Sequence, residues 1–375
     1  MSSAPKELPH WVDVVLVPAA SVATAFVAAG LVVLAIGENP LEALQILLRG
    51  ALGSGEGVGF TLYYATNFIF TGLAVAVAFH AGLFNIGGEG QAYLGGLGAA
   101  LIALAFDSSL PAIILLPLAV IASAAFGALW AFVPAWLQAK RDSHIVITTI
   151  MFNFLAATLM VYLLAGPLKP LGSMAPDTRG FTAAAQLPTI KGVLVLFGAT
   201  IPSSPLNLTF FLALLAAAFV WLLIWRSRLG YEIRAFGHNP AAAAYAGISA
   251  TRITIITLLI SGALAGLMAS NEILGVHHRL SLGFVSGYGF VGIAVALMGR
   301  SHPVGVVLAS LLFGVLYQGG AELAFEKPAI TRDMIVVIQG LVILFAGALE
   351  RQFRAPLTAL FGRRPSRAET QAATS

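Results

Sequence analysis

The chain has 375 residues, of which 59% are hydrophobic and only 10% are charged, and its mean hydropathy is +0.92. An average soluble domain is about 25% charged, so this composition excludes a water-soluble globular protein. The formal net charge is +4, but no basic stripe with interleaved aromatic residues occurs, which argues against a nucleic-acid partner. The absence of cysteine excludes disulfides and thiolate-bound metals.

Ten apolar runs are candidates for membrane-spanning helices. They lie at 14–37, 58–79, 92–106, 111–136, 145–166, 207–225, 253–275, 286–299, 303–320 and 334–349. A helix needs about 20 apolar residues to cross the hydrocarbon core, so the runs 92–106, 286–299 and 334–349 are candidates for half-spans or re-entrant segments. The sequence therefore predicts an all-α, polytopic integral membrane protein with about ten transmembrane helices, some of them short or broken.

The charges between these runs predict the topology. With both termini in the cytoplasm, thirteen lysine and arginine residues lie on the inner side and seven on the outer side, as the positive-inside rule requires. The first apolar run is longer than a signal-peptide core, so we expect a retained anchor. We expect one transmembrane domain over 1–350 and a basic, disordered, lipid-touching cytoplasmic tail over 351–375.

Two external loops are expected, at 38–57 and 167–206. In the first, Asn39 can cap a helix that begins at Pro40, and leucines on one face oppose polar residues on the other. We expect an amphipathic helix on the membrane surface. The second loop contains six prolines and either docks an external partner or is an irregular lid without one.

The loop 226–252 is the longest cytoplasmic connection. Asn239 is a good N-cap, Pro240 suits the first helical position, and Gly247 suits the C-terminal stop, so we expect a helix of about two turns. Tyr245 gives this helix an apolar side chain with no core beneath it. The loop is either a solvated connector or a docking surface for a cytoplasmic partner, and the sequence favours docking.

The segment 84–91, FNIGGEGQ, sets polar residues and three glycines between two apolar runs. A carboxylate at membrane depth costs several kcal/mol, and irregular backbone there is tolerated only against protein or along a water-filled path. We expect Glu89 to be structural or gating, paired with backbone groups or amides near Gly87–Gly90, rather than a proton carrier. The candidate residues of a solute path are Phe84, Asn85, Glu89, Gln91, Tyr93, Asn153, Asn271 and Glu272.

Most of these polar side chains are neutral amides, which suit an uncharged polar solute. For any single buried amide, the favoured interpretation is an interhelical hydrogen-bonding group. For the 84–91 segment as a whole we favour the path. The glycine-rich passages 84–96 and 286–299 could be counterparts in two halves of the chain, as in many transporters.

Two glycine motifs are best explained by packing. GYGFVG at 287–292 matches a dinucleotide-binding fingerprint, but no strand precedes it and no acidic residue follows about 20 residues later. GALAG at 262–266 is a small-residue face of the kind that lets membrane helices approach closely. The sequence contains neither a P-loop nor an HExxH motif, so we do not expect this chain itself to hydrolyse ATP.

Three passages together resemble a known family. They are GLFNIGGEGQ at 82–91, RAFGHNPAAAAYAGI at 234–248, and EILGVHHRLSLGFVSGYGFVGIAVALMGR at 272–300. They are similar to permease subunits of bacterial ABC importers for simple sugars and nucleosides, a branched-chain-type permease family, and to its nucleoside-type branch. The resemblance implies a type II ABC importer-like fold in the bacterial inner membrane.

The resemblance also implies partners. These are cytoplasmic ABC ATPase subunits that use ATP and Mg, a second and often different permease subunit, and an external substrate-binding lipoprotein, with no cofactor in this chain. It makes 237–248 the coupling helix that sits in a cleft of the ATPase. The residues expected to form that helix and its ends are Gly237, His238, Asn239, Pro240, Ala243, Tyr245 and Gly247.

The sequence therefore predicts a permease subunit rather than an enzyme, with nucleosides as the first-choice substrate and simple sugars as the second. The alternative is a stand-alone, ion-coupled secondary transporter that uses Glu89 or Glu272. A membrane enzyme is a more distant third reading, because no nucleophile accompanies these carboxylates.

Overall fold

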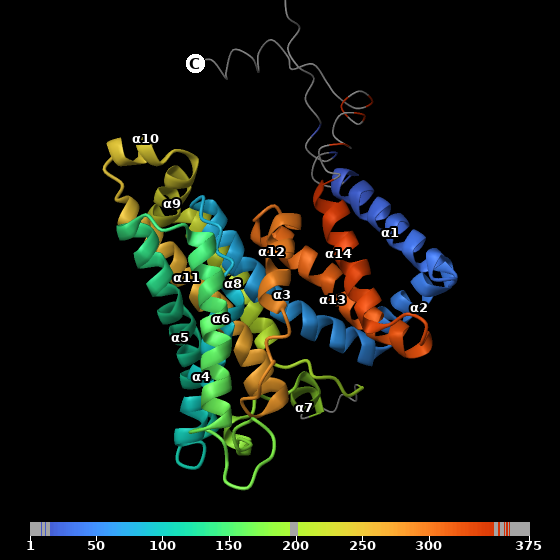
Figure 1. The fold of residues 1–375 in the computed structure, drawn as a ribbon, viewed down its shortest axis with the longest axis horizontal. Coiled ribbons are helices and arrows are strands. Elements are labelled where there is room, and N and C mark those ends of the chain that lie inside the picture. The colour runs from blue at the N-terminus through green and yellow to red at the C-terminus, as the bar shows by residue number, and fades with distance from the viewer. Residues whose placement is uncertain are drawn as a thin grey trace, which may run out of the picture. The chain divides into compact units, whose positions relative to one another are not determined.

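Figure 1 shows a computed structural model of the chain, which describes residues 16–195 and 202–348 and a few isolated residues (Pro9, Val12, Gln352, Pro356, Thr358 and Leu360). In these residues no β-strand forms, and only two isolated bridges occur, between Asp177 and Ser281 and between Thr189 and Asn207. The predicted all-α class is confirmed. The predicted tail 351–375, apart from its four isolated residues, lies outside the described residues.

The described helices follow one another along the chain. They are α1 (Val17–Ala35), α2 (Pro40–Leu52), α3 (Gly55–His80), α4 (Gly88–Phe106), α5 (Ala112–Arg141), α6 (Ile145–Ala165), η2 (Ala183–Ala185), α7 (Ile190–Val195), α8 (Thr209–Arg226), α9 (Arg228–His238), α10 (Pro240–Tyr245), α11 (Ala250–Glu272), η3 (Ile273–His277), α12 (Tyr288–Met298), α13 (Pro303–Glu326) and α14 (Arg332–Ala348). The segment η3 is a π-helical turn that continues α11.

Each of the ten predicted runs coincides with one helix. Seven helices of the described part are long and apolar enough to cross a membrane: α3, α4, α5, α6, α8, α11 together with η3, and α13. The pair α1 and α2, bent by 117°, could form an eighth span. Helix α12 has only 11 residues, so at 1.5 Å per residue it is about 16 Å long, which is roughly half of the hydrocarbon thickness. The chain is a multi-pass membrane protein.

The described residues form two compact units, one made of the chain up to Leu47 together with the part from Gly320 onward, and the other made of Leu48–Gly319. In the first unit α1 packs against α14. The Lys327 ammonium lies 3.2 Å from a Glu38 carboxylate oxygen and 3.0 Å from one of Glu42. These ion pairs connect the end of α13 to the start of α2.

Helix α2 begins as predicted. The Asn39 side-chain oxygen accepts hydrogen bonds from the backbone N–H groups of Leu41 (3.0 Å) and Glu42 (3.5 Å), and Pro40 is the first helical residue. An asparagine cap satisfies N–H groups that have no partner within the helix. The local signals of the sequence therefore placed this helix correctly.

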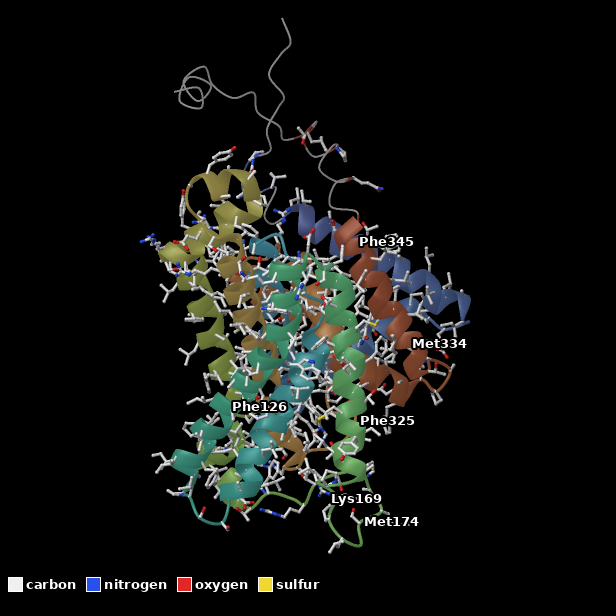
Figure 2. All side chains as sticks on the ribbon, turned by 60° about the vertical axis from the view of Figure 1, so that its left-hand side comes forward. Phe126, Lys169, Met174, Phe325, Met334 and Phe345 are labelled. Atoms are coloured by element: carbon white, nitrogen blue, oxygen red, sulfur yellow. The ribbon has the colours of Figure 1, made fainter. Side chains whose placement is uncertain are left out.

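The second unit is built around α11, which contacts α3, α4 and α5. Figure 1 shows α4, α5, α6 and α11 side by side. Small residues allow the closest approach: a Cβ atom at Gly127 of α5 would overlap the Gly262 carbonyl of α11, and the Ser123 hydroxyl donates to the Gly266 carbonyl over 2.6 Å. Phe126 lies beside them in the same bundle (Figure 2) and packs where Gly98 of α4 has no side chain. The packing interpretation of GALAG is confirmed.

Loops that the predicted topology puts on one side contact one another. At the end of α3 the His80 ring nitrogen lies 3.0 Å from the Ser301 carbonyl oxygen, and the His80 ring contacts the Trp225 ring at the end of α8. At the other end of the bundle, Asp107 pairs with Arg179 of the long outer loop, which extends past α6 near Lys169 (Figure 2). The side of the membrane on which each loop lies stays a prediction.

The loop 226–252 contains two helices, where the sequence predicted one. Helix α10 has the predicted cap, since the Asn239 side-chain oxygen accepts from the Ala242 N–H over 3.0 Å, and Gly247 has the left-handed φ of +80° that a helix stop requires. Helix α9 was missed, because its two glycines lower its helix propensity. Gly230 is needed there, because a Cβ atom would overlap the Leu223 carbonyl of α8.

Candidate functional site

The 84–91 segment divides into a loop over 84–87 and the first turn of α4. Asn85, with 1% of its surface exposed, lies at its centre. Its side-chain nitrogen donates to Gln91 Oε1 (3.0 Å) and Ser261 Oγ (2.8 Å), and its oxygen accepts from Gly87 N (2.8 Å) and Gln91 Nε2 (3.2 Å). All four hydrogen-bonding positions of the amide are used. In this structure Asn85 and Gln91 therefore hold the loop in shape.

Two side chains of α6 fasten the same loop. Asn153 Oδ1 accepts from the Gly90 N–H over 2.8 Å, and Asn153 Nδ2 donates to the Ile86 carbonyl over 2.9 Å. Thr149 Oγ1 accepts from the Ile86 N–H over 3.3 Å. The structure thus brings three predicted residues, Asn85, Gln91 and Asn153, into one network. Their contact with a solute stays a prediction.

Glu89 connects two helix N-termini. Its Oε1 accepts from the Gly287 N–H over 2.9 Å and its Oε2 from the Gly289 N–H over 2.8 Å, so one carboxylate caps α12. The expectation of partners near Gly87–Gly90 was wrong, because both N–H groups that bind the carboxylate lie at the N-terminus of α12. The positive end of a helix dipole favours a carboxylate at this position.

The depth of this junction follows from α12. The C-terminal end of α12 adjoins the turn that contains Ser301, which lies against the end of α3. Since α12 is about 16 Å long, its N-terminus lies well inside the hydrocarbon region. A Cβ atom at Gly289 would overlap the backbone of Glu89, so the two glycine-rich segments are in direct contact. Helix N-termini that meet at mid-depth are a feature of transporter binding regions.

A second polar network surrounds Glu272 at the end of α11, and its carboxylate is 2% exposed. Its Oε1 accepts from the Tyr63 hydroxyl (2.6 Å) and from the Asn67 side-chain nitrogen (2.5 Å), both on α3. Its Oε2 lies 3.3 Å from the half-exposed His277 ring. Glu272 therefore joins α3 to α11.

Asn271 extends this network toward α8. Its side-chain nitrogen donates to Asn67 Oδ1 over 2.8 Å, and its oxygen accepts from Asn207 Nδ2 (2.8 Å) and from the Thr209 hydroxyl (2.7 Å). The roles of Tyr63, Asn207 and Thr209 were missed by the sequence reasoning. Asn207 is the first residue of the apolar run 207–225 and could have been recognised as a buried polar residue.

A cluster of aromatic rings adjoins the Glu272 network. We define the aromatic cluster as Tyr63, Tyr64 and Phe68 of α3, Tyr288 of α12, and Phe313 and Tyr317 of α13. Neighbouring ring centroids in it lie between 4.8 and 6.5 Å apart. Of its members, Tyr64 and Tyr317 are only partly buried. The missed signal was an aromatic pair at i, i+4 on each of α3 and α13, which places both rings on one helix face.

The other predicted aromatic residues lie outside the aromatic cluster. The Phe84 ring stacks on Phe79 at 5.1 Å, and the Tyr93 ring meets Phe284 edge-on at 5.4 Å. The first pair connects α3 to the loop before α4, and the second connects α4 to the loop before α12. Whether either ring contacts a solute stays a prediction.

The residues predicted to form the coupling helix lie at the end of α9 and along α10. Gly237 packs on the turn after α3, where a Cβ atom would overlap the His80 carbonyl. Ala243 is 3% exposed, whereas Tyr245 on the same short helix is 96% exposed. Helix α10 is thus held on one side and presents an aromatic side chain on the other. His238, Asn239 and Pro240 make the corner between the two helices.

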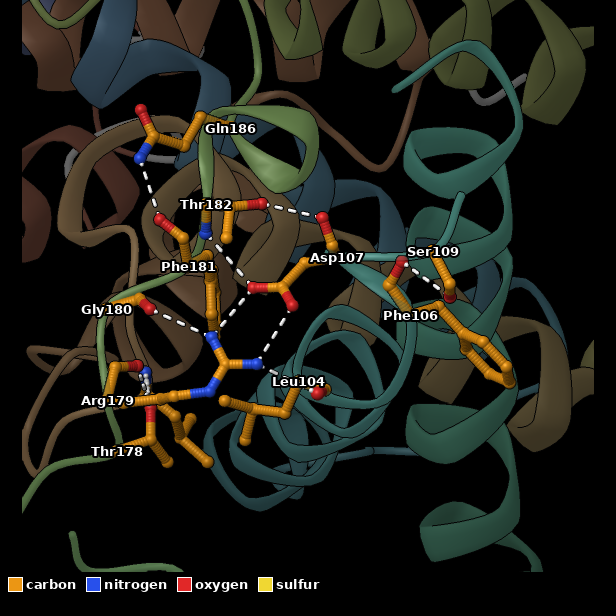
Figure 3. A network of polar contacts seen from close by, with 11 residues as sticks. Leu104, Phe106, Asp107, Ser109, Thr178, Arg179, Gly180, Phe181, Thr182 and Gln186 are labelled. Atoms are coloured by element: carbon orange, nitrogen blue, oxygen red, sulfur yellow. Dashed lines mark hydrogen bonds and ion pairs between the residues drawn. The ribbon is translucent and has the colours of Figure 1, made fainter. Parts of the chain in front are cut away.

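The long outer loop is fastened at the opposite end of the bundle (Figure 3). The Arg179 guanidinium donates to both carboxylate oxygens of Asp107, over 2.8 and 2.9 Å, and the Thr182 N–H donates to the same carboxylate over 3.0 Å. The hydrogen bonds from Arg179 lower the pKa of the Asp107 carboxyl below its ordinary value. This ion pair connects the end of α4 to the loop.

Further along, the loop covers the end of α11. The Phe181 N–H donates to the His278 carbonyl (2.7 Å), the Thr178 N–H to the Leu280 carbonyl (2.9 Å), and the Leu187 N–H to the Leu274 carbonyl (2.9 Å). The loop is therefore an ordered cover in the part that the structure describes. In that part of the chain no group of three or more acidic or histidine side chains could hold a metal ion.

Comparison with known proteins gives a consistent result. A family described as the permease component of the branched-chain amino acid transport system matches residues 57–347. The chain is 38% identical to a glucose ABC transporter permease of Haloferax volcanii over 331 residues, which are 88% of this chain and 86% of that protein. It is 37% identical to a guanosine ABC transporter permease of Bacillus subtilis over 344 residues, with 92% and 94% coverage. It is 34% identical to a nucleoside ABC transporter permease of Lactococcus lactis over 339 residues, with 88% and 90% coverage.

Proposed function

The chain belongs to the branched-chain-type permease family of ABC importers, and we propose that it is the membrane-spanning subunit of a nucleoside importer. Two of the three relatives described above are named for nucleosides or guanosine and one for glucose, so a sugar is the second choice of substrate. Nucleosides combine a flat base with polar hydroxyl groups. The aromatic cluster beside the amides of the Glu272 network offers both kinds of contact.

The observation that supports ATP-driven transport best is that the short helix α10 exposes an aromatic side chain. In this six-residue helix Ala243 is buried, whereas Tyr245 is 96% exposed and is not covered by any described residue. Exposed aromatic side chains of this kind anchor protein interfaces. Family membership implies ATPase and substrate-binding partners, and we propose that α10 is the part of this chain that enters the ATPase.

The remaining assembly follows from the same proposal. A second permease subunit, different from this one, would complete the path, and a binding lipoprotein would deliver the solute to the outer loop 167–206. Both termini would be cytoplasmic, in the bacterial inner membrane. ATP and Mg would act in the ATPase subunits, with no cofactor in this chain.

Glu89 fits a structural or gating role in this proposal. Both of its carboxylate oxygens accept backbone N–H groups of α12, and an ion-coupled carrier would have to break these bonds to bind and release its ion. Two helix N-termini facing one carboxylate leave the junction nearly neutral, which suits an uncharged solute.

Reconstitution tests the proposal. The chain is placed in liposomes with its ATPase and binding-protein partners, and uptake of labelled guanosine, adenosine, ribose and glucose is measured with ATP inside or with a proton gradient alone. We expect ATP-dependent nucleoside uptake that is lost when the ATPase carries a substituted P-loop lysine. Uptake by the chain alone, driven by protons and abolished by Glu89→Gln, would instead establish the ion-coupled alternative.

The substrate class has its own test. Tyr64→Leu and Tyr317→Leu remove stacking faces from the aromatic cluster at partly buried positions, and we expect a fivefold or larger loss of nucleoside uptake, since base–aromatic stacking contributes about 1–3 kcal/mol. Phe219→Leu, at an exposed ring on α8, is the matched control. Equal losses of glucose and nucleoside uptake would contradict the assignment of the aromatic cluster to the base.

A further inference from the structure

A pocket of about 340 Å³ lies at the corner between α9 and α11 and is lined by Arg228, Leu229, Glu232 and Arg252. Arg228 and Leu229 are the first two residues of α9, and Arg252 is in the first turn of α11. The pocket is separate from the aromatic cluster and from the networks around Glu89 and Glu272. Nothing in the proposed transport cycle uses it.

The depth of the pocket follows from the two helices that flank it. Helix α8 ends at Arg226 and α11 begins at Ala250, and both are long and apolar enough to span a membrane. Their adjoining ends therefore mark one membrane surface. The Arg226 guanidinium lies over the Trp221 ring at 5.3 Å, a pairing typical of the interfacial zone. The pocket thus lies at the level of the lipid headgroups rather than in bulk solvent.

The charge of the pocket selects a monoanion. Glu232 Oε1 accepts from Arg228 Nε over 3.1 Å, which neutralises one guanidinium. The Arg252 guanidinium makes no hydrogen bond or ion pair with any residue in the described part of the chain. Two arginines and one glutamate give the lining a net charge of +1. A phosphodiester has one negative charge and two oxygens that match a guanidinium.

We propose that this pocket binds the phosphate of an anionic phospholipid. Leu229 supplies an apolar wall against which the glycerol and the start of the acyl chains would lie. A soluble phosphate has no apolar part that could contact this wall. Arginines near a membrane surface attract anionic lipids. Because the pocket includes the first turn of α9, the lipid would fix the base of the segment that leads to α10.

Lipid titration tests the assignment on the purified full-length chain in a neutral detergent. The probes are phosphatidylglycerol, phosphatidylcholine and glycerol 3-phosphate, and the readouts are the thermal unfolding midpoint and the lipid retained in native mass spectrometry. We expect phosphatidylglycerol to raise the midpoint in a saturable manner, and phosphatidylcholine and glycerol 3-phosphate to have no such effect. Arg252→Gln and Arg228→Gln should each raise the half-saturating lipid concentration about five- to tenfold.

Two further variants separate specific binding from general charge effects. Glu232→Gln removes the negative charge of the lining and should lower the half-saturating concentration about threefold or more, a gain that damage to the fold would not produce. Arg141→Gln removes an equal charge at the end of α5, where the guanidinium lies over the Trp136 ring at 5.8 Å, and should leave the titration unchanged.

Three results would overturn the proposal. An unchanged titration in both Arg252→Gln and Arg228→Gln would exclude the pocket as the lipid site, and loss of ATPase binding in the same variants would then assign it to the protein partner. An equal loss of lipid affinity in Arg141→Gln would show that the stabilisation by phosphatidylglycerol depends only on general surface charge. Equal protection by glycerol 3-phosphate would assign the pocket to a soluble anion.

Discussion

The ion pair between Asp107 and Arg179 makes the sharpest stability prediction, through the variant Asp107→Asn. The native carboxylate accepts three hydrogen bonds, two from the Arg179 guanidinium and one from the Thr182 N–H. Asparagine has nearly the same shape but has no charge, and only one of its two side-chain atoms accepts. The guanidinium would then face an amide nitrogen that also donates, so its paired contact is lost.

The expected magnitude follows from the exposure of the two partners. Breaking a fully buried ion pair costs about 3–5 kcal/mol. The Asp107 side chain is 1% exposed, but that of Arg179 is 47% exposed, so the guanidinium recovers hydration and the cost falls. We expect Asp107→Asn to lower the free energy of opening the loop by about 2 kcal/mol, which is within the range for hydrogen bonds to charged groups. This free energy corresponds to a factor of about 30 in the opening equilibrium of the loop.

Hydrogen exchange measured by mass spectrometry reports this opening directly. The N–H groups of Thr178, Phe181 and Leu187 bond to carbonyls near the end of α11, so a peptide over 178–187 should exchange about 30-fold faster in Asp107→Asn, with α5 unchanged. The control is Asp177→Asn, whose partner Arg279 is 50% exposed and whose loss should change exchange less than threefold. Exchange in Asp107→Asn within threefold of the native chain would refute the reasoning.

Three further predictions concern pH, docking and packing. The folded-state pKa of Asp107 is lowered, so the stabilisation by its carboxylate is fully present above the unfolded pKa of about 3.9. This stabilisation is lost as the pH falls through the lower folded pKa. Thermal midpoints of the native chain should therefore drop more steeply below pH 4 than those of Asp107→Asn. Tyr245→Asp should reduce ATP-driven uptake tenfold or more at unchanged thermal stability. The control Tyr231→Asp, at a 62% exposed site on α9, should not reduce uptake in this way. Equal effects of the two variants on uptake would exclude a special role of α10. Gly127→Ala should lower the free energy of unfolding by about 1–3 kcal/mol, since its Cβ would overlap the Gly262 carbonyl. Gly340→Ala should be neutral or slightly stabilising, because among the described residues an added Cβ would meet no atom within 4 Å outside the adjoining helix backbone. Similar denaturation curves for the two variants would contradict the packing account.

Local signals in the sequence were sufficient for the ten apolar helices and for α2 and α10. Each of the ten apolar runs coincides with a helix, seven of which are long and apolar enough to cross a membrane. Single caps such as Asn39 and Asn239 fixed where α2 and α10 begin. Each of these features depends on residues within one or two turns of each other. The short run 286–299 is indeed a short helix, the 11-residue α12, whereas the short run 92–106 belongs to α4, which has 19 residues and is long enough to cross a membrane.

Contacts between distant segments could not be predicted in this way. The sequence showed that Glu89 needed partners, but the N–H groups that satisfy it lie almost 200 residues away, at Gly287 and Gly289. The aromatic cluster and the Glu272 network combine side chains of α3, α11, α12 and α13, and their assembly depends on how these helices pack. Helix α9 was missed for the related reason that its glycines are favourable only through tertiary packing, Gly230 against α8 and Gly237 against the turn after α3.

The contacts also connect α10 to the centre of the membrane domain. Gly237, at the end of α9, packs on the turn after α3, where Gly82 lies. That turn leads into the loop 84–87, which in turn leads into the first turn of α4. There Glu89 binds the N-terminus of α12. Asn85 and Asn153 hold the loop 84–87 and the start of α4 with six hydrogen bonds. Helix α12 is held to Glu89 by only two hydrogen bonds. We therefore expect a displacement of α10 to move the loop as one body and to open the junction at α12 first. A double-mutant cycle in ATP-driven uptake between Gly237→Ala and Glu89→Gln measures this connection, and strictly additive effects would mean that α10 acts on the solute path by another route.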